Sequence, residues 1–438
     1  MSRIADLSSP TFPREPAKAI SIQLRVCSLV FALVVIAGTL CALRKDVTQG
    51  FDELAHTSYV ASLQKSGDWW PRLETMRMLD PESFRFGEQL NYLNLPSPYY
   101  LFFARLGPQL EGQPKAIIID RLMNVVLVAL GVAALLAIGF FARLSDVVLY
   151  AYVVPIGAIP ILAPLAGSIN NDNAAFFGGA VALLGAWRLI ATRRTLWLYV
   201  ALGGVLIASW AKLTGLMLSG GMLAGVFLYL FWRRAFRFEW TVPAIAAVLL
   251  AAAPYFALVL QYGSPTPNTP GRIDMFVSGA HTAGWDVAPR LSPVSYTLFF
   301  VTQFVEQWMP SLSARNALNY TMLFIPVATA LCAGVGVMFS LRRIGRREEG
   351  PLDILVAAGS IVGLATFAIH IAFSYRQHLA YGWMLDAYPR YYLPLIAIVS
   401  LATLSLLAAV KHPRARSMLA GFLIIGPIVF RLLGGPLR

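Results

Sequence analysis

Residues 22–43 read IQLRVCSLVFALVVIAGTLCAL, an apolar stretch long enough to cross about 30 Å of membrane hydrocarbon as a single helix. Similar stretches recur to the end of the chain. Of the 438 residues, 58% are hydrophobic and only 13% are charged, whereas a soluble protein is about one quarter charged. This composition excludes a disordered chain, a nucleic-acid-binding module and an ordinary water-soluble enzyme. The sequence therefore predicts an all-α polytopic membrane protein.

We predict about eleven transmembrane helices, at residues 22–43, 116–141, 147–165, 174–190, 196–210, 213–232, 241–260, 320–341, 354–373, 391–410 and 418–433. The first is too long for the core of a signal peptide, so we expect it to be retained as an anchor. Residues 1–21 form a cytoplasmic lead, and residues 22–438 form a single transmembrane domain.

Basic residues mark one side of this membrane domain. Every second short connection is basic, and the connections between them are not; the basic residues are Arg143, Arg188, Arg193, Arg194, Arg233, Arg234, Arg237, Arg342, Arg343, Arg346, Arg347, Lys411, Arg414 and Arg416. The positive-inside rule then places the N-terminus in the cytoplasm. It also accounts for most of the net charge of +13, so we expect no nucleic-acid partner.

The remaining connections face outward and are unequal in length. Residues 44–115 and 261–319 form two long loops, and residues 374–390 form a shorter one rich in polar and aromatic residues. We expect these outer loops to carry short interfacial helices. Because functional residues concentrate on loops that a rigid scaffold holds in place, the outer face is the predicted working face.

An acidic pair, Asp52 and Glu53, opens the first outer loop. If this stretch is helical, His56 shares a face with both carboxylates. Adjacent carboxylates raise each other's pKa, which suits a general base. The alternative is a solvated start to an amphipathic interfacial helix.

The sequence does not indicate a metal site. One Glu-x-x-His pair supplies too few ligands for a metal ion. The three cysteines lie in apolar stretches, so neither a disulfide framework nor a thiolate metal site is predicted.

Further motifs follow in a fixed order. They are the Asn91–Tyr100 stretch, in which prolines precede aromatic residues, Arg121 in the second span, Ser168-Ile-Asn-Asn-Asp172, Ala211-Lys-Leu-Thr-Gly215 and Pro389-Arg-Tyr-Tyr-Leu-Pro394. In this order, and together with the acidic pair and Ala55-His56, they resemble the GT-C superfamily of integral-membrane glycosyltransferases, which use polyprenyl-phosphate-linked sugars. The resemblance covers most of residues 22–438 and implies a GT-C-like fold.

The resemblance also implies roles for these residues. An acidic residue of the first outer loop would be the catalytic base, Asp52 first and Glu53 second, in an inverting transfer of one sugar to a lipid, glycan or protein acceptor. Lys212 and Arg390 would hold the lipid phosphate. The remaining candidates for binding substrate are His56, Arg121, Asn171, Asp172 and Tyr391.

Structural alternatives stay open for several of these residues. Lys212 and Arg390 would also serve as snorkelling anchors, Arg121 as a partner of Asp120, and Asn171 with Asp172 as a helix cap. One departure concerns the aminoarabinose-transferase branch, in which a lysine precedes a proline pair. Here Leu95 precedes Pro96, and Ser97 interrupts the pair.

Two other function classes compete with a transferase. A flippase for a lipid-linked glycan would carry charges near mid-span and internal repeats, whereas here the charges gather at the ends of the spans. A surface-polysaccharide polymerase or ligase would share the lipid carrier. The sequence does not identify a resident cofactor. Outer acidic residues offer ligands for a divalent cation, Mg²⁺ or Mn²⁺, although no oxygen-ligand loop pattern occurs. A bacterial inner membrane is the predicted location, with the site facing the periplasm.

Overall fold

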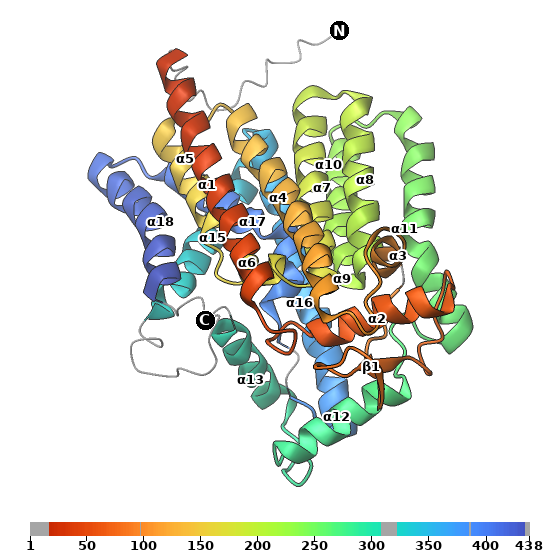
Figure 1. Cartoon of the computed structure of the whole chain (residues 1–438). Coiled ribbons are helices and arrows are strands. Elements are labelled where there is room, and N and C mark those ends of the chain that lie inside the picture. Colours follow the sequence, from red (N-terminus) through yellow and green to blue (C-terminus); the bar gives the residue numbers. More distant parts are fainter. Residues whose placement is uncertain (1–16, 97, 308–321, 385–386, 434–438) are drawn as a thin grey trace.

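The computed structural model describes residues 17–96, 98–307, 322–384 and 387–433, so residues 1–16 of the predicted lead and Ser97 lie outside the described residues. The described chain is almost entirely helical (Figure 1). Its first half comprises α1 Ala17–Arg44, α2 Glu53–Ser66, β1 Arg77–Leu79, β2 Phe86–Leu90, α3 Pro98–Leu106, η1 Pro114–Ala116, α4 Ile117–Phe141, α5 Asp146–Gly157, α6 Leu162–Ala166, α7 Asp172–Thr192 and α8 Thr195–Ala211. Its second half comprises α9 Leu213–Gly215, η2 Leu216–Gly220, α10 Gly221–Trp232, η3 Phe238–Trp240, α11 Thr241–Tyr262, α12 Pro270–Thr282, α13 Pro293–Glu306, α15 Phe324–Arg346, α16 Pro351–Tyr381, η4 Pro389–Leu395, α17 Ala397–Ala409 and α18 Pro413–Leu433.

Among the described residues, eight helices are long and apolar enough to span a membrane, or nine if a bent pair counts as one span. The all-helical membrane fold is therefore confirmed, but the count of eleven is not. The predicted stretches that the structure describes are mainly helical; the one at 147–165 is interrupted between α5 and α6. Three of them fall short of a full straight span.

The three exceptions have local causes. Helix α5 contains Pro155 and ends at Gly157, so it has only 12 residues. Helix α8 ends at Ala211 because Lys212 takes an extended backbone conformation. The stretch at 391–410 divides into η4 and α17, which meet at an angle of 63°; Pro389 and Pro394 both lie in the short 3-10 segment.

Helix α16 continues as far as Tyr381, so the first part of the stretch expected as an outer loop at 374–390 is helical. Short helices do occur in the two long loops, α2 and α3 in the first and α12 and α13 in the second. The hairpin of β1 and β2 was not foreseen; it is antiparallel and pairs Arg77 with Leu90 and Leu79 with Phe86.

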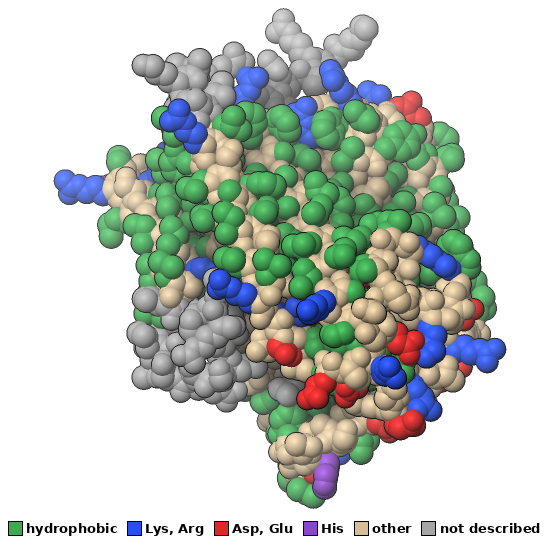
Figure 2. Space-filling view, in the orientation of Figure 1, with side chains coloured by type: hydrophobic (Ala, Val, Ile, Leu, Met, Phe, Trp, Pro, Cys, Tyr) green, Lys and Arg blue, Asp and Glu red, His purple; other side chains and the backbone are tan. Residues whose placement is uncertain are grey.

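The two ends of the bundle differ in character. At one end, Gln23 donates to the carbonyl of Leu144, Trp240 donates to Thr195, and Arg233 pairs with Glu349. These contacts gather the predicted inner connections. The opposite end, which we call the loop-rich end, carries α2, the hairpin, α3, α12 and α13 (lower part of Figure 1). Figure 2 shows a broad apolar belt between them, with basic side chains along its upper rim and most of the visible acidic side chains near the loop-rich end.

Close packing at the loop-rich end fixes the first loop on the bundle. Tyr59 of α2 stacks on Tyr100 of α3 with ring centroids 3.9 Å apart, and both rings are fully buried. They belong to an apolar cluster that also includes Ala175 of α7 and Ala211 of α8. Residues at the start of α2 are therefore held in a defined position relative to α7 and α8.

Candidate active site

Asp52 lies in the tight connection between α1 and α2. Phe51 and Asp52 both take left-handed backbone conformations, with φ of 60° and 58°, which residues other than glycine adopt at some cost. Asp52 occupies the N-cap position of α2, yet its carboxylate makes no capping bond to that helix. Instead, the carboxylate accepts a hydrogen bond from Tyr92 at 3.0 Å and another from Arg390. In this connection the Asp52 carboxylate therefore contacts Tyr92 and Arg390 and not the first turn of α2.

Arg390 joins Asp52 to a second acidic residue. Its Nε lies 3.3 Å from the carboxylate of Asp172, the first residue of α7. On the other carboxylate oxygen, Asp172 accepts a hydrogen bond of 2.8 Å from the Nζ of Lys212. We call these four residues (Asp52, Asp172, Lys212 and Arg390) the charge cluster. Two carboxylates balance two cations in it.

Exposure distinguishes Asp52 from the other members of the charge cluster. Its side chain is 38% exposed, against 8% for Arg390 and 2% for Asp172. Burial raises the pKa of Asp52, but the charge of Arg390 and hydrogen bonds from Arg390 and Tyr92 hold the net pKa below its ordinary value. Asp52 is therefore an ionised and accessible carboxylate beside two cations.

Lys212 sits in the break between α8 and α9. Its ammonium lies 3.4 Å from the ring centroid of Tyr391, which is a close cation–π contact. Burial lowers the pKa of Lys212 to about 8, although the charge of Asp172 opposes that shift. Tyr391 also flanks the Arg390 guanidinium, together with Tyr388 and Phe51. The ring of Tyr391 thus contacts both cations, Lys212 and Arg390.

Glu53, the other member of the acidic pair, is fully occupied by structural contacts. Its side chain is 0% exposed. Arg121 donates to both carboxylate oxygens, at 2.8 and 2.9 Å, Lys45 donates at 3.1 Å, and the backbone N–H of Ile169 donates at 2.9 Å. Arg121 also donates to the carbonyls of Ala42 and Lys45 at the end of α1. This Glu53 cluster joins the end of α1 to α2, α4 and the loop before α7.

His56 lies in the interior. It is 3% exposed, and burial lowers its pKa to about 3, so the ring is neutral at physiological pH. The backbone N–H of Asp172 donates to Oδ1 of Asn170, which orients that amide so that its NH₂ group faces the Nε2 of His56 at 3.1 Å. The proton of His56 is therefore on Nδ1, which donates to the hydroxyl of Tyr100 at 2.8 Å.

Asn171 and Asp172 differ in their contacts. Asn171 is fully buried, and its amide donates to the carbonyl of Ala211 at 2.7 Å, which satisfies the last carbonyl of α8. Asp172 belongs to the charge cluster. The structure thus brings five predicted residues together (Asp52, Asp172, Lys212, Arg390 and Tyr391), places Glu53 with Arg121 in a separate cluster, and puts His56 and Asn171 in buried supporting positions.

Some residues around the site were not predicted. Tyr92, Asn170 and Lys45 contact the predicted residues directly. Tyr92 and Asn170 belong to motifs that the sequence displays, so their position within those motifs was a usable signal. No three His, Cys, Asp or Glu side chains within the described ranges gather in a way that would hold a metal ion. A divalent cation stays a prediction.

Comparison with known proteins gives few matches. No protein-family model and no curated protein matches this chain. The solved structure of ArnT from Cupriavidus metallidurans in the apo state is similar at 14% identity, over 90% of this chain and 61% of that chain, with a TM-score of 0.49. ArnT from the same organism bound to undecaprenyl phosphate is similar at 14% identity, over 95% and 79% of the two chains, with a TM-score of 0.36.

The chain thus spans about three fifths of the length of the first of these structures. Because both TM-scores lie below 0.5, the chemistry of the site has to be inferred from the contacts of its own residues.

Proposed function

We propose that the chain is an inverting glycosyltransferase, which moves a sugar from a polyprenyl-phosphate donor to an acceptor at the outer face of a bacterial inner membrane. One observation supports this most directly: an accessible carboxylate, Asp52, lies beside two buried cations, Lys212 and Arg390, at the loop-rich end of a membrane bundle. A nucleophilic substitution at a sugar with a phosphate leaving group needs both kinds of group.

In this proposal Asp52 is the general base. Its carboxylate takes the proton of the acceptor hydroxyl as that oxygen attacks the anomeric carbon, and the bond from the anomeric carbon to the phosphate oxygen breaks. Attack opposite the leaving group inverts the anomeric centre. Glu53 cannot take this role without losing its contacts to Arg121 and Lys45, so we assign it to the support of α2.

Lys212 and Arg390 would stabilise the negative charge that develops on the departing phosphate. In the charge cluster each cation is already paired with a carboxylate. The donor phosphate adds a further negative charge and competes with Asp52 for Arg390. As Arg390 turns to the phosphate, Asp52 loses the neighbour that lowers its pKa, and its basicity rises. Donor binding would thereby prepare the base.

Mass spectrometry of surface glycans and glycolipids tests the proposed function. A strain lacking the gene should miss one sugar, and the wild-type gene should restore it. Loss of a single sugar mass, with build-up of its lipid-linked donor, supports the transferase. Accumulation of a complete lipid-linked glycan on the cytoplasmic side would instead identify a flippase, and loss of whole repeat units a polymerase or ligase.

The pKa of Lys212 predicts a pH dependence for binding of the lipid phosphate. Below pH 8 the ammonium is charged and attracts the phosphate; above pH 8 it loses its proton, so affinity should fall by up to about tenfold per pH unit. Undecaprenyl phosphate is a suitable probe, because a phosphate monoester loses its second proton near pH 6. Its dissociation constant should rise between pH 7.5 and 9.5 in nanodiscs.

Lys212→Arg provides the matched control, since arginine stays charged throughout this range. The dissociation constant of undecaprenyl phosphate for this variant should not change between pH 7.5 and 9.5. An equal rise in the dissociation constant for both proteins would show that another group titrates.

A further inference from the structure

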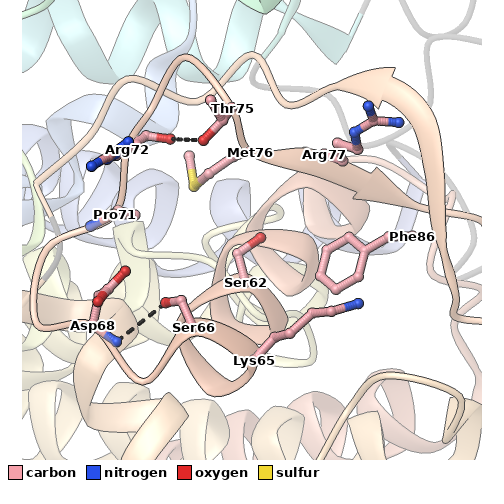
Figure 3. A pocket seen from close by; sticks show the side chains of 10 residues that line it. All are labelled: Ser62, Lys65, Ser66, Asp68, Pro71, Arg72, Thr75, Met76, Arg77 and Phe86. Carbon is pink, nitrogen blue, oxygen red and sulfur yellow. Dashed lines mark hydrogen bonds between the residues drawn. The ribbon is translucent and has the colours of Figure 1, made fainter.

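A cavity of about 320 Å³ opens on the first loop, away from the charge cluster. Three segments form its walls: the last turns of α2, the segment from Asp68 to Met76, and the β hairpin at Arg77 and Phe86 (Figure 3). Its volume lies at the lower end of the range of about 300–1,000 Å³ that small-molecule sites occupy. It therefore has room for a small ligand or for one unit of a larger one.

The charged side chains that line the cavity favour an anion. The lining contains three cationic side chains, Lys65, Arg72 and Arg77, and one carboxylate, Asp68. Lys65 pairs with Glu111 at 2.9 Å, and Arg77 pairs with Glu88 at 2.6 Å. These two cations are thus already neutralised by neighbours outside the lining.

Arg72 is different. The residue is exposed, and no carboxylate of the described residues lies within ion-pair distance of its guanidinium. The Glu74 carboxylate is near enough for the charge of Arg72 to contribute to lowering its pKa, but that carboxylate accepts its hydrogen bond from the hydroxyl of Tyr262, at 2.7 Å. A planar guanidinium whose N–H groups are not already donated to a carboxylate matches a carboxylate or a phosphate through two parallel hydrogen bonds.

The rest of the lining suits a sugar ring. Met76, Pro71 and Phe86 supply apolar surface, and Lys65 lies 4.8 Å from the centroid of the Phe86 ring (Figure 3). The hydroxyl of Ser66 accepts from the N–H of Asp68 and keeps its own proton to donate. Apolar surface beside hydroxyl groups fits the C–H face and the hydroxyls of a sugar.

We infer that this cavity binds an anionic sugar unit of the acceptor, a ring that carries a carboxylate or a phosphate, with Arg72 holding the anion. The acceptor role rests on the proposed function. Helix α2 links the two places: Asp52 precedes its first residue, and Ser62 of the cavity wall comes nine residues after Glu53, about 14 Å along a helix. The cavity would hold a part of the acceptor remote from the reacting hydroxyl.

Binding to the purified full-length chain in nanodiscs tests this inference. The probes are tetragalacturonate, neutral maltotetraose and inorganic phosphate, each followed by isothermal titration calorimetry. The variants are Arg72→Gln and, as a matched control, Arg85→Gln, which removes an exposed cation of the same loop outside the cavity lining. Tetragalacturonate should bind wild type and Arg85→Gln equally and Arg72→Gln about tenfold more weakly, in line with loss of a charged hydrogen bond.

Maltotetraose should bind at least about tenfold more weakly than tetragalacturonate. Three results would overturn the inference: equal losses in both variants, which indicate general charge attraction; equal affinity for the neutral probe; or inorganic phosphate binding as tightly as tetragalacturonate, which indicates a bare anion site. Absence of any binding would overturn it too. Since this experiment needs no turnover, its failure is distinguishable from failure of sugar transfer.

Discussion

Asp52→Asn should lower sugar transfer at least about a hundredfold, and as much as ten-thousandfold, because it removes the proposed general base. The amide keeps the shape of the carboxylate and can still accept from Tyr92. Arg390 retains Asp172 as a partner at 3.3 Å. The variant should therefore fold and insert normally while it fails to transfer sugar. The measurement is the amount of the transferred sugar, by mass spectrometry, in the complemented deletion strain at matched membrane expression.

Asp46→Asn is the control for this experiment. Asp46 is an exposed acid of the same connection, and among the described residues its carboxylate accepts hydrogen bonds only from Thr48. Its substitution should leave transfer within about twofold of wild type, as is usual for surface changes. If Asp52→Asn restored more than a tenth of the sugar, Asp52 would not be the base.

Glu53→Gln should act on stability and not directly on chemistry. It leaves Arg121 and Lys45 without the carboxylate to which both donate. Removing one partner from a buried ion pair costs about 3–5 kcal/mol, which is a large part of the stability of a typical domain. We expect little folded protein in the membrane and a clearly lower melting temperature in detergent.

Asp120→Asn provides the contrast, one residue from Arg121. Asp120 is 0% exposed, and neither of its carboxylate oxygens has a hydrogen-bond partner in the described structure. Because burying an unpaired carboxylate is costly, the Asp120→Asn protein should have the same melting temperature as wild type or a higher one. A Glu53→Gln protein that folded as well as Asp120→Asn but transferred no sugar would return Glu53 to the role of base.

Much of the fold could be predicted from the sequence because apolar length is a local property. Most of each predicted span that the structure describes is helical, although the one at 147–165 is interrupted between α5 and α6. The breaks were harder to predict, since they depend on single residues inside apolar stretches. Lys212 interrupts what hydropathy reads as two adjacent helices, and Pro389 with Pro394 turns the start of a late span into η4.

The candidate site shows the same division. The acidic pair is visible in the sequence, but the sequence could not separate Asp52 from Glu53. What separates them is Arg121, which lies 68 residues from Glu53 in the chain. In the same way, Lys212 and Asp172 are each conspicuous, whereas their ion pair joins residues 40 positions apart. Such pairings follow from tertiary packing, and no local pattern encodes them.

The contact between Asp52 and Arg390 has a consequence for the kinetics of a two-substrate enzyme. An acceptor that arrives first would meet a carboxylate still held by its guanidinium partner and too weak a base to take a proton. The donor would have to arrive first, because its phosphate is the group that draws Arg390 away. The two substrates would then add in a compulsory order, donor before acceptor.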